Sequence, residues 1–355
     1  MTSTVRTWTR GLAALVEPLL TPHGADRYLE LVDPMLVRRE IRAEVLAVRH
    51  QTEDTVTLTV RPNRAWPGFT AGQYVRVSVD IDGVRTTRCY SPACSQHRTD
   101  GLLEFTIKAH GDGLVSRYLH NDIRAGAVLG LSEPDGEFTL PWPRPERIVL
   151  ISAGSGITPV RAMYRTLADE RHTGDVVHVH YATGPDDALY RDEFTGGQVL
   201  AYTRARHPAR LHGRFGLAHL AEVAPWYREA QTYACGPERL LAAVLTEYGA
   251  AGLGERLHTE QFTPAPIEAG ESGGTVRFTR SDVAVANSGE PLLDQGENAG
   301  LTLAYGCRMG ICHSCTKVKT AGQVRDAVSG RCSAEENEEI RLCVSVPVGD
   351  VDINA

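Results

Sequence analysis

The stretch that decides how the C-terminal part of this chain folds reads Cys307-Arg-Met-Gly-Ile-Cys312-His-Ser-Cys315. Its cysteines have C-x4-C-x2-C spacing, and Cys343 follows in the apolar stretch Ile340–Val346, which predicts a strand. Four thiolates hold the two irons of a 2Fe–2S cluster, and one loop with a distant strand can supply them. The spacing therefore predicts a 2Fe–2S site.

Other features of the sequence narrow the alternatives for this cysteine group. A chain of 355 residues has a core large enough to fold without disulfides, so a tight group among its eight cysteines indicates metal or redox chemistry. Zinc sites favour paired C-x2-C knuckles, which the sequence lacks, and unrelated buried cysteines are the other alternative. Gly306 and Gly310 let backbone amides approach the sulfur atoms. Cys332 has polar neighbours, and we interpret it as a spare thiol.

The cysteine group belongs to a compact α+β module at residues 275–355. A linker of Pro, Gly, Ser and acidic residues precedes it at 263–274. The module resembles a plant-type ferredoxin, which has a β-grasp fold, from Thr275 to Asn354. The resemblance implies a fixed set of cluster ligands: Cys307, Cys312, Cys315 and Cys343.

Upstream of the linker, residues 144–262 alternate between strand and helix patterns. The apolar run Ile148–Ser152 is followed by a glycine turn and a helix to about Asp169. Such alternation predicts a doubly wound parallel α/β sheet. The glycine turn suits a pyrophosphate at a helix N-terminus, although a tight turn without a ligand is the alternative. Its motif residues are Gly154, Gly156, Thr158 and Pro159.

Residues 41–143 have a different pattern, with short β-prone runs, a hairpin turn at Asp82-Gly83 and one helix, Leu114–His120. Several short strands at this spacing predict a small antiparallel β-barrel. The runs are Val45–Val48, Val56–Val60, Tyr74–Val79 and Leu103–Ile107.

Two short motifs on this barrel suit a flavin. Arg88-Cys-Tyr90-Ser91 supplies a forked phosphate donor, a flat aromatic face and a hydroxyl for a ring nitrogen. Gly113-Leu-Val-Ser116 opens the predicted helix and offers a second phosphate site. An ordinary strand end and an ordinary helix cap would look the same.

In this order, the motifs resemble the ferredoxin–NADP reductase superfamily over Ile41 to Phe262, because Cys235-Gly236-Pro237 completes the set. The resemblance implies that Arg88, Tyr90, Ser91, Gly113 and Ser116 hold the flavin, with Phe262 nearby. It implies that Gly154, Gly156, Thr158 and Pro159 hold the nicotinamide nucleotide. It also implies that three catalytic residues lie near the nicotinamide: Ser91, Cys235 and Glu260. Gly236 and Pro237, which follow Cys235 in the same motif, are implied to bind the cofactor.

The domain order, reductase first and ferredoxin last, resembles reductase components of bacterial oxygenases and fatty-acyl desaturases. The segments Leu29–Pro34 and Gly306–His313 look closest to actinobacterial desaturase partners. The resemblance implies electron flow from NAD(P)H through FAD, rather than FMN, and a 2Fe–2S cluster to a separate terminal enzyme. A desaturase is the first expectation, and a haem-thiolate monooxygenase or non-haem oxygenase is the alternative. A non-enzymatic redox sensor is the alternative from another class.

Two further groups of residues concern specificity and chemistry. Thr203-Arg204-Ala-Arg206 follows a predicted strand where this superfamily recognises the adenosine 2′ position, so an arginine there predicts NADPH over NADH. Solvated loop arginines are the alternative, and the acidic residues Asp186 and Asp187 favour NADH instead.

The chain lacks the histidine motifs of a Rieske centre or a desaturase, so we interpret His178 and His180 as residues that pack within a strand.

Bulk composition sets the remaining expectations. The net charge of −7 argues against nucleic-acid binding, and no apolar run is long enough for a membrane span, so a cytoplasmic monomer is expected. Residues 1–40 form an N-terminal extension whose segment 5–20 predicts a helix with one apolar stripe. The first interpretation is that this stripe packs on the flavin domain of the same chain. The alternative is that it docks peripherally to the inner face of a membrane or to a membrane desaturase. The stripe contains Trp8, Leu12, Leu15, Val16 and Leu19.

Overall fold

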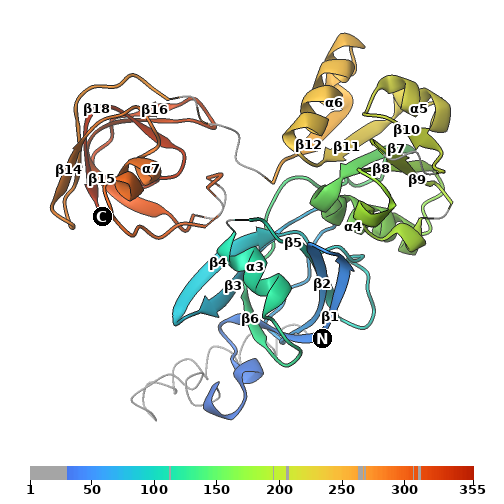
Figure 1. The fold of residues 1–355 in the computed structure, drawn as a ribbon, viewed down its shortest axis with the longest axis horizontal. Coiled ribbons are helices and arrows are strands. Elements are labelled where there is room, and N and C mark those ends of the chain that lie inside the picture. The colour runs from blue at the N-terminus through green and yellow to red at the C-terminus, as the bar shows by residue number, and fades with distance from the viewer. Residues whose placement is uncertain are drawn as a thin grey trace, which may run out of the picture.

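The computed structural model describes residues 30–111, 113–194, 196–204, 208–262, 267, 269–306, 308–310 and 313–355. The predicted helix at 5–20, Arg206, Cys307 and Cys312 lie outside these described residues. Figure 1 shows three separate sheets, coloured blue to cyan, green to yellow and orange to red along the chain. No helix in the described part of the chain is long and apolar enough to cross a membrane.

The first sheet is antiparallel, with strand order β4-β3-β6-β1-β2-β5. A bridge between Pro92 and Phe105 brings the segment after β4 beside β5, which curls the sheet toward closure. Helix α3 (Leu114–Asn121) buries Val115 and Leu119 in the barrel core. The predicted barrel is thus confirmed. Its strands are β1 (Ile41–Thr52), β2 (Thr55–Pro62), β3 (Val75–Ile81), β4 (Val84–Tyr90), β5 (Leu103–Lys108) and β6 (Val128–Leu131).

The hairpin between β3 and β4 turns at Asp82 and Gly83, as predicted. Both residues have positive φ, 51° and 80°, as a two-residue hairpin turn requires. This turn brings β4 back along β3, so that its last residue, Tyr90, pairs with Val75 at the start of β3.

The second sheet is parallel throughout, with strand order β10-β9-β8-β7-β11-β12. Alternate residues of β7 belong to different cores: Leu150 packs with α4 on one face, and Ile151 packs with α6 on the other. The doubly wound α/β prediction is therefore confirmed. The elements are β7 (Arg147–Ala153), α4 (Ile157–Asp169), β8 (Asp175–Ala182), β9 (Gln198–Tyr202), β10 (Leu211–His212), α5 (Leu217–Val223), β11 (Gln231–Cys235), α6 (Glu238–Ala250) and β12 (Leu257–Glu260).

The third sheet has the order β14-β13-β18-β15-β16, and β17 also pairs with β15. β13 and β18 are parallel, while the pairs β13–β14, β15–β16, β15–β17 and β15–β18 are antiparallel, and α7 packs Leu292 and Leu293 into the core. This arrangement confirms the ferredoxin-like module. Its elements are β13 (Thr275–Phe278), β14 (Val283–Ala286), α7 (Leu292–Asn298), β15 (Thr316–Asp326), β16 (Cys332–Ser333), β17 (Glu338–Arg341) and β18 (Ser345–Asn354).

One local prediction was wrong. Ile340–Val346 is not a continuous strand, because β17 ends at Arg341 and the chain turns through Cys343 before β18. The amide of Val344 donates a hydrogen bond to the carbonyl of Arg341. The run is apolar because the turn itself is buried, and an apolar run does not distinguish a buried turn from a strand.

Short 3₁₀ helices complete the described structure: η1 (Pro34–Leu36), η2 (Gly154–Gly156), η3 (Pro185–Asp187), η4 (Arg191–Glu193), η5 (Tyr227–Glu229) and η6 (Gly254–Arg256). η2 forms the nucleotide turn after β7, while η3 and η4 carry Asp187 and Glu193.

Candidate active site and cluster centre

The nucleotide motif lies at the carboxyl edge of the parallel sheet. The chain leaves β7, turns through Gly154, whose φ is +52°, and enters α4. In open α/β sheets, ligands bind at this edge where the strand order reverses, and here the reversal lies between β7 and β11. Amides at the start of α4 can receive a phosphate there. Pro159 lies in the first turn of α4, where a backbone amide would have no acceptor within the helix, so proline loses no hydrogen bond there.

Gly156 packs against the segment that follows β11. A Cβ added at Gly156 would overlap the carbonyl of Cys235 and the Cα of Gly236, so only glycine fits there. Thr158 is buried, and its hydroxyl donates to the carbonyl of Ser155 (3.1 Å), which holds the turn closed. The two glycine-containing motifs therefore form one floor at the carboxyl edge, with Pro237 at the N-cap of α6.

Cys235 and Glu260 end neighbouring parallel strands and are paired in register. The Cys235 side chain is fully buried, and Oε2 of Glu260 is buried without a hydrogen-bond partner among the described residues. Burial raises the pKa of Glu260 to about 8. Burial, reinforced by the nearby Glu260 carboxyl, also raises the pKa of the Cys235 thiol. Near neutral pH, both groups are therefore largely uncharged.

The surroundings of Glu260 combine an apolar surface with one buried polar atom that has no partner among the described residues. Phe262 packs into the same apolar cluster as Cys235, so the floor beside Glu260 is apolar. A buried polar atom without a partner is costly, and a ring carrying a carboxamide or heteroatoms would give Glu260 one. The residues present therefore suit a nicotinamide or flavin ring.

The barrel side of the site carries the predicted flavin residues at the end of β4. Ser91 is buried, and its Oγ has no hydrogen-bond partner within the described part of the chain. Tyr90 packs against the barrel core. Arg88 donates a hydrogen bond to the carbonyl of Thr87 (2.8 Å) and lies between barrel and ferredoxin module. The unpartnered Ser91 hydroxyl is the group on this side that fits a ring nitrogen or oxygen.

The second predicted phosphate site lies where α3 begins at its N-cap, Gly113. The Ser116 hydroxyl donates to the carbonyl of Gly113 (3.1 Å) and accepts from the amide of His110 (3.2 Å). The side chain therefore closes the loop before the helix. The groups that suit a phosphate here are the amides of the first helical turn.

Barrel and nucleotide domain meet through the segment after Ser91. Ala93 packs with Ile157, the first residue of α4, in one buried cluster. Arg161, one turn further along α4, donates to the carbonyl of Ala93. These contacts hold the Ser91 segment against the start of the nucleotide-binding helix.

Arg161 is the centre of a buried charged network, since its side chain is only 4% exposed. It pairs with Glu104 of β5 (2.9 Å) and with Glu193 (2.8 Å), and its guanidinium lies 3.9 Å from the ring centroid of Tyr190. Burial opposes ionisation of Glu104, but Arg161 and Arg98 outweigh it and lower the pKa of that carboxyl. A fully paired buried network of this kind fixes the orientation of the two domains.

The predicted 2′-phosphate region lies beside the carboxyl end of β8. The amide of Thr203 donates to the carbonyl of Ala182 (2.9 Å), and the amide of Arg204 donates to that of Thr183 (3.2 Å). Arg204 is exposed, as is Asp186. Asp187 accepts hydrogen bonds from Thr183 and also contacts Lys108 of the barrel at 3.4 Å. The Asp187 charge is therefore directed toward the domain boundary.

The structure brings together the two predicted cluster ligands that it describes. Cys315 and Cys343 are buried, and the amide of Cys343 donates to Sγ of Cys315 at 3.5 Å. Amide donation of this kind stabilises a thiolate, so the pair fits an iron–sulfur cluster. Gly310 has φ +74°, and an added Cβ there would lie 2.9 Å from Val344. Cys332 is exposed on β16, apart from this buried pair.

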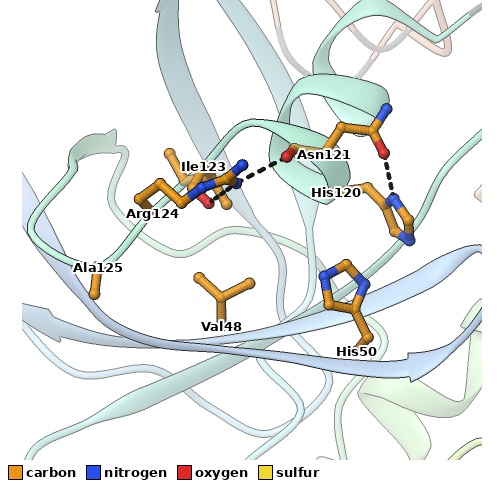
Figure 2. Close-up of a pocket in the computed structure, with 7 residues that line it drawn as sticks. All are labelled: Val48, His50, His120, Asn121, Ile123, Arg124 and Ala125. Atoms are coloured by element: carbon orange, nitrogen blue, oxygen red, sulfur yellow. Dashed lines mark hydrogen bonds between the residues drawn. The ribbon is translucent and has the colours of Figure 1, made fainter.

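Two other features lie apart from the site. His178 and His180 are fully buried, and both rings bond to the hydroxyl of Ser152 at 2.8 Å, which confirms that they pack within the sheet. A shallow pocket of about 540 Å³ lies between β1 and the end of α3, with His50 and His120 on its wall (Figure 2). It contains none of the predicted site residues.

Comparisons with known proteins agree with this geometry. Three family models match in order: an oxidoreductase FAD-binding domain (residues 43–140), an oxidoreductase NAD-binding domain (150–246) and a 2Fe–2S iron–sulfur cluster binding domain (277–348). The chain is 36% identical over 351 residues to an NADPH oxidoreductase of Mycobacterium tuberculosis, covering 96% of this chain and 90% of that protein. It belongs to this family of three-domain FAD and 2Fe–2S reductases.

Two further proteins are similar to this chain, one in sequence and one in fold. The glycine betaine monooxygenase reductase subunit of Pseudomonas aeruginosa is 31% identical, covering 81% of this chain and 87% of that subunit. Phthalate dioxygenase reductase has the same fold, with a TM-score of 0.61 and 22% identity over 88% of this chain and 97% of that one. As a reductase, this chain is an NAD(P)H-dependent oxidoreductase rather than a non-enzymatic sensor.

Sequence reasoning missed the residues that join the domains, chiefly Arg161, Tyr190 and Tyr305. Arg161 lies in a helix with other charged residues, and its burial depends on a barrel more than fifty positions upstream. Tyr305 lies two residues before Cys307, and this position beside the cluster ligands is the sequence feature that could have indicated its importance.

Proposed function

We propose that this protein takes hydride from NADPH and passes electrons one at a time, through FAD and the 2Fe–2S cluster, to a separate terminal oxygenase. The observation that carries the proposal is the uncharged, buried pair of Cys235 and Glu260 at the carboxyl edge, directly beside the Gly156 turn. A bound flavin supplies the conversion of a two-electron donor into one-electron steps. The protein supplies the apolar floor and the fixed domain orientation.

The proposed roles follow the three parts of the chain. Arg88, Tyr90, Ser91, Gly113 and Ser116 hold the flavin, with Phe262 beside it. Gly154, Gly156, Thr158, Pro159, Gly236 and Pro237 hold the nucleotide, and Thr203, Arg204 and Arg206 contact its 2′-phosphate. Cys235 and Glu260, with Ser91, line the place of hydride transfer, and Cys307, Cys312, Cys315 and Cys343 bind the cluster.

An oxygenase is the acceptor best supported by the relatives, since one is named as a monooxygenase reductase subunit. A fatty-acyl desaturase is the second candidate, favoured by the likeness of Leu29–Pro34 to desaturase partners. Docking of segment 5–20 at a membrane belongs to that second candidate. A soluble acceptor would not need it.

The test uses the full-length protein with its native flavin and cluster. Extraction identifies the flavin, and steady-state rates with ferricyanide give specificity constants for NADPH and NADH. Reconstitution with a soluble oxygenase and with a desaturase in vesicles, in the presence of each enzyme's substrate, then compares coupled product formation. A protein that holds both cofactors but oxidises neither nucleotide would contradict the proposal.

A further inference from the structure

The ring of Tyr305 contacts two guanidinium groups that come from different domains. The Cζ of Arg308 is 4.1 Å from the tyrosine ring centroid, and the Cζ of Arg88 is 5.3 Å from it. Both distances are within the range of a cation–π contact. Tyr305 is half-buried at the start of the cluster loop, whereas Arg88 is on β4 of the barrel, so this ring joins the two parts.

The ferredoxin side of the contact is held firmly. Arg308 forms ion pairs with Asp294 (2.9 Å) and Glu297 (2.6 Å), both of which lie on α7. Tyr305 itself packs against the core of the module. The ring is thus fixed relative to the cluster loop, and Arg88 is the group that it meets on the barrel.

Arg88 has two separate surfaces to offer. A guanidinium donates hydrogen bonds in its plane, toward a phosphate or carbonyl oxygen, and stacks on aromatic rings with its face. One in-plane nitrogen already donates to the carbonyl of Thr87. The edge and the face can therefore be used at the same time by two different partners.

We propose that the face of Arg88 docks the cluster loop through Tyr305 while its edge holds the flavin phosphate, so that Arg88 couples flavin binding to cluster placement. This inference rests on the proposed function for the role of Arg88. Tyr305 is a positioning residue, since it acts through Arg88. One weak contact can matter here because the two parts belong to one chain, which keeps their effective concentration high.

The test compares the full-length holoprotein with Tyr305→Ala and Tyr305→Phe variants. Trp142→Ala is the matched control, because Trp142 also stacks on an arginine, Arg144 (5.5 Å), but is 80% exposed and away from the cluster loop. Small-angle scattering measures how closely the parts dock, fluorescence titration measures FAD affinity, and visible absorption verifies that each variant retains its cluster. Activity is followed with ferricyanide and with cytochrome c.

Tyr305→Ala should enlarge the radius of gyration and lower NADPH–cytochrome c reduction by about two- to fivefold, the factor that one exposed cation–π contact supports. Ferricyanide reduction should be unchanged. FAD affinity should fall by a similar factor, because coupling between two sites is reciprocal. Tyr305→Phe and Trp142→Ala should behave like the natural protein.

Unchanged scattering and cytochrome c reduction in a cluster-loaded Tyr305→Ala protein would overturn the proposal. Loss of docking in Tyr305→Phe equal to that in Tyr305→Ala would also overturn it, since the ring alone should suffice. Normal FAD affinity with impaired docking would overturn the coupling through Arg88. If the natural holoprotein oxidised no nucleotide, the proposed function would fail, whereas the scattering comparison would still decide the docking.

Discussion

Cys235 and Glu260 end adjacent parallel strands in register, and burial raises the pKa of both side chains, that of Glu260 to about 8, while the Glu260 carboxyl raises the pKa of the Cys235 thiol further. Two ionisable groups at the carboxyl edge of the sheet are therefore uncharged at neutral pH. This favours the binding of a planar, uncharged ring, because a charged side chain buried beneath such a ring would need a partner of opposite charge.

Glu260→Gln should stabilise the purified flavoprotein in a pH-dependent way. The folded pKa of Glu260, about 8, lies above its ordinary value of 4.5. Below pH 4.5 both states are protonated and the variant has no advantage. Between pH 4.5 and 8 only the unfolded chain ionises, so the natural protein loses stability relative to the variant, by an amount on the order of a few kcal/mol above pH 8. Melting temperatures at pH 5, 6.5 and 8 measure this, with exposed Glu255→Gln as the control. An advantage that does not grow with pH would contradict the prediction.

Cys315→Ser should abolish the visible absorption of the cluster, because an alcohol is a poor substitute for the thiolate that iron requires. Cytochrome c reduction should be lost, whereas ferricyanide reduction, which can draw on the flavin, should survive. Cys332→Ser is the matched control, since that thiol is exposed. A changed spectrum in the control would show that Cys332 is a ligand.

Gly156→Ala should weaken both folding and nucleotide binding. The added methyl group would overlap the Cys235 carbonyl, and overpacking of this kind costs about 1–3 kcal/mol. We expect a lower melting temperature and a KM for NADPH raised about tenfold as the turn shifts. Gly254→Ala, in the same domain with no atom within 4 Å of an added Cβ, should change neither. Equal effects at the two glycines would refute the packing argument.

Arg161→Met should destabilise the protein by about 1–3 kcal/mol, because buried Glu104 loses one of its two arginine partners and keeps only Arg98 at 2.6 Å. Arg165→Met is the control on the same helix, since Arg165 contacts Glu193 from an exposed position, with 41% of its side chain accessible. Its loss should cost less than about 1 kcal/mol. Chemical denaturation, monitored by the release of flavin, gives the free energy of unfolding of each variant. A larger loss of stability in Arg165→Met than in Arg161→Met would contradict the prediction.

Arg204→Ala should lower the specificity constant for NADPH by about tenfold and leave that for NADH unchanged, as expected for a charge-assisted contact to the 2′-phosphate. Lys108 contacts Asp187, the acid that could favour NADH, across the domain boundary. A higher specificity constant for NADH in the natural protein would exclude this preference. Unaltered selectivity in the variant would remove Arg204 from it.

Features that depend on neighbouring residues could be predicted from the sequence. The β7 run, its glycine turn and α4 form one local unit, as does the Asp82-Gly83 hairpin, and both have the predicted structure. The turn at Cys343 was mistaken for a strand because its burial, which makes it apolar, comes from the rest of the module. The partners of Arg161 and Tyr305 depend on how separate domains meet, and no local pattern encodes that.

The buried polar boundary at Arg161 has a consequence for chimeric proteins. A nucleotide domain grafted from a relative without a matching arginine would leave Glu104 of the recipient barrel with Arg98 as its remaining arginine partner, so these two domains are best exchanged as a pair or with Arg161 retained. The ferredoxin module contacts the barrel through a stacked ring rather than a buried charge, and a transplanted module needs only an aromatic residue at position 305 to use the same arginine face. Recombination should therefore be tolerated at the third domain and penalised between the first two.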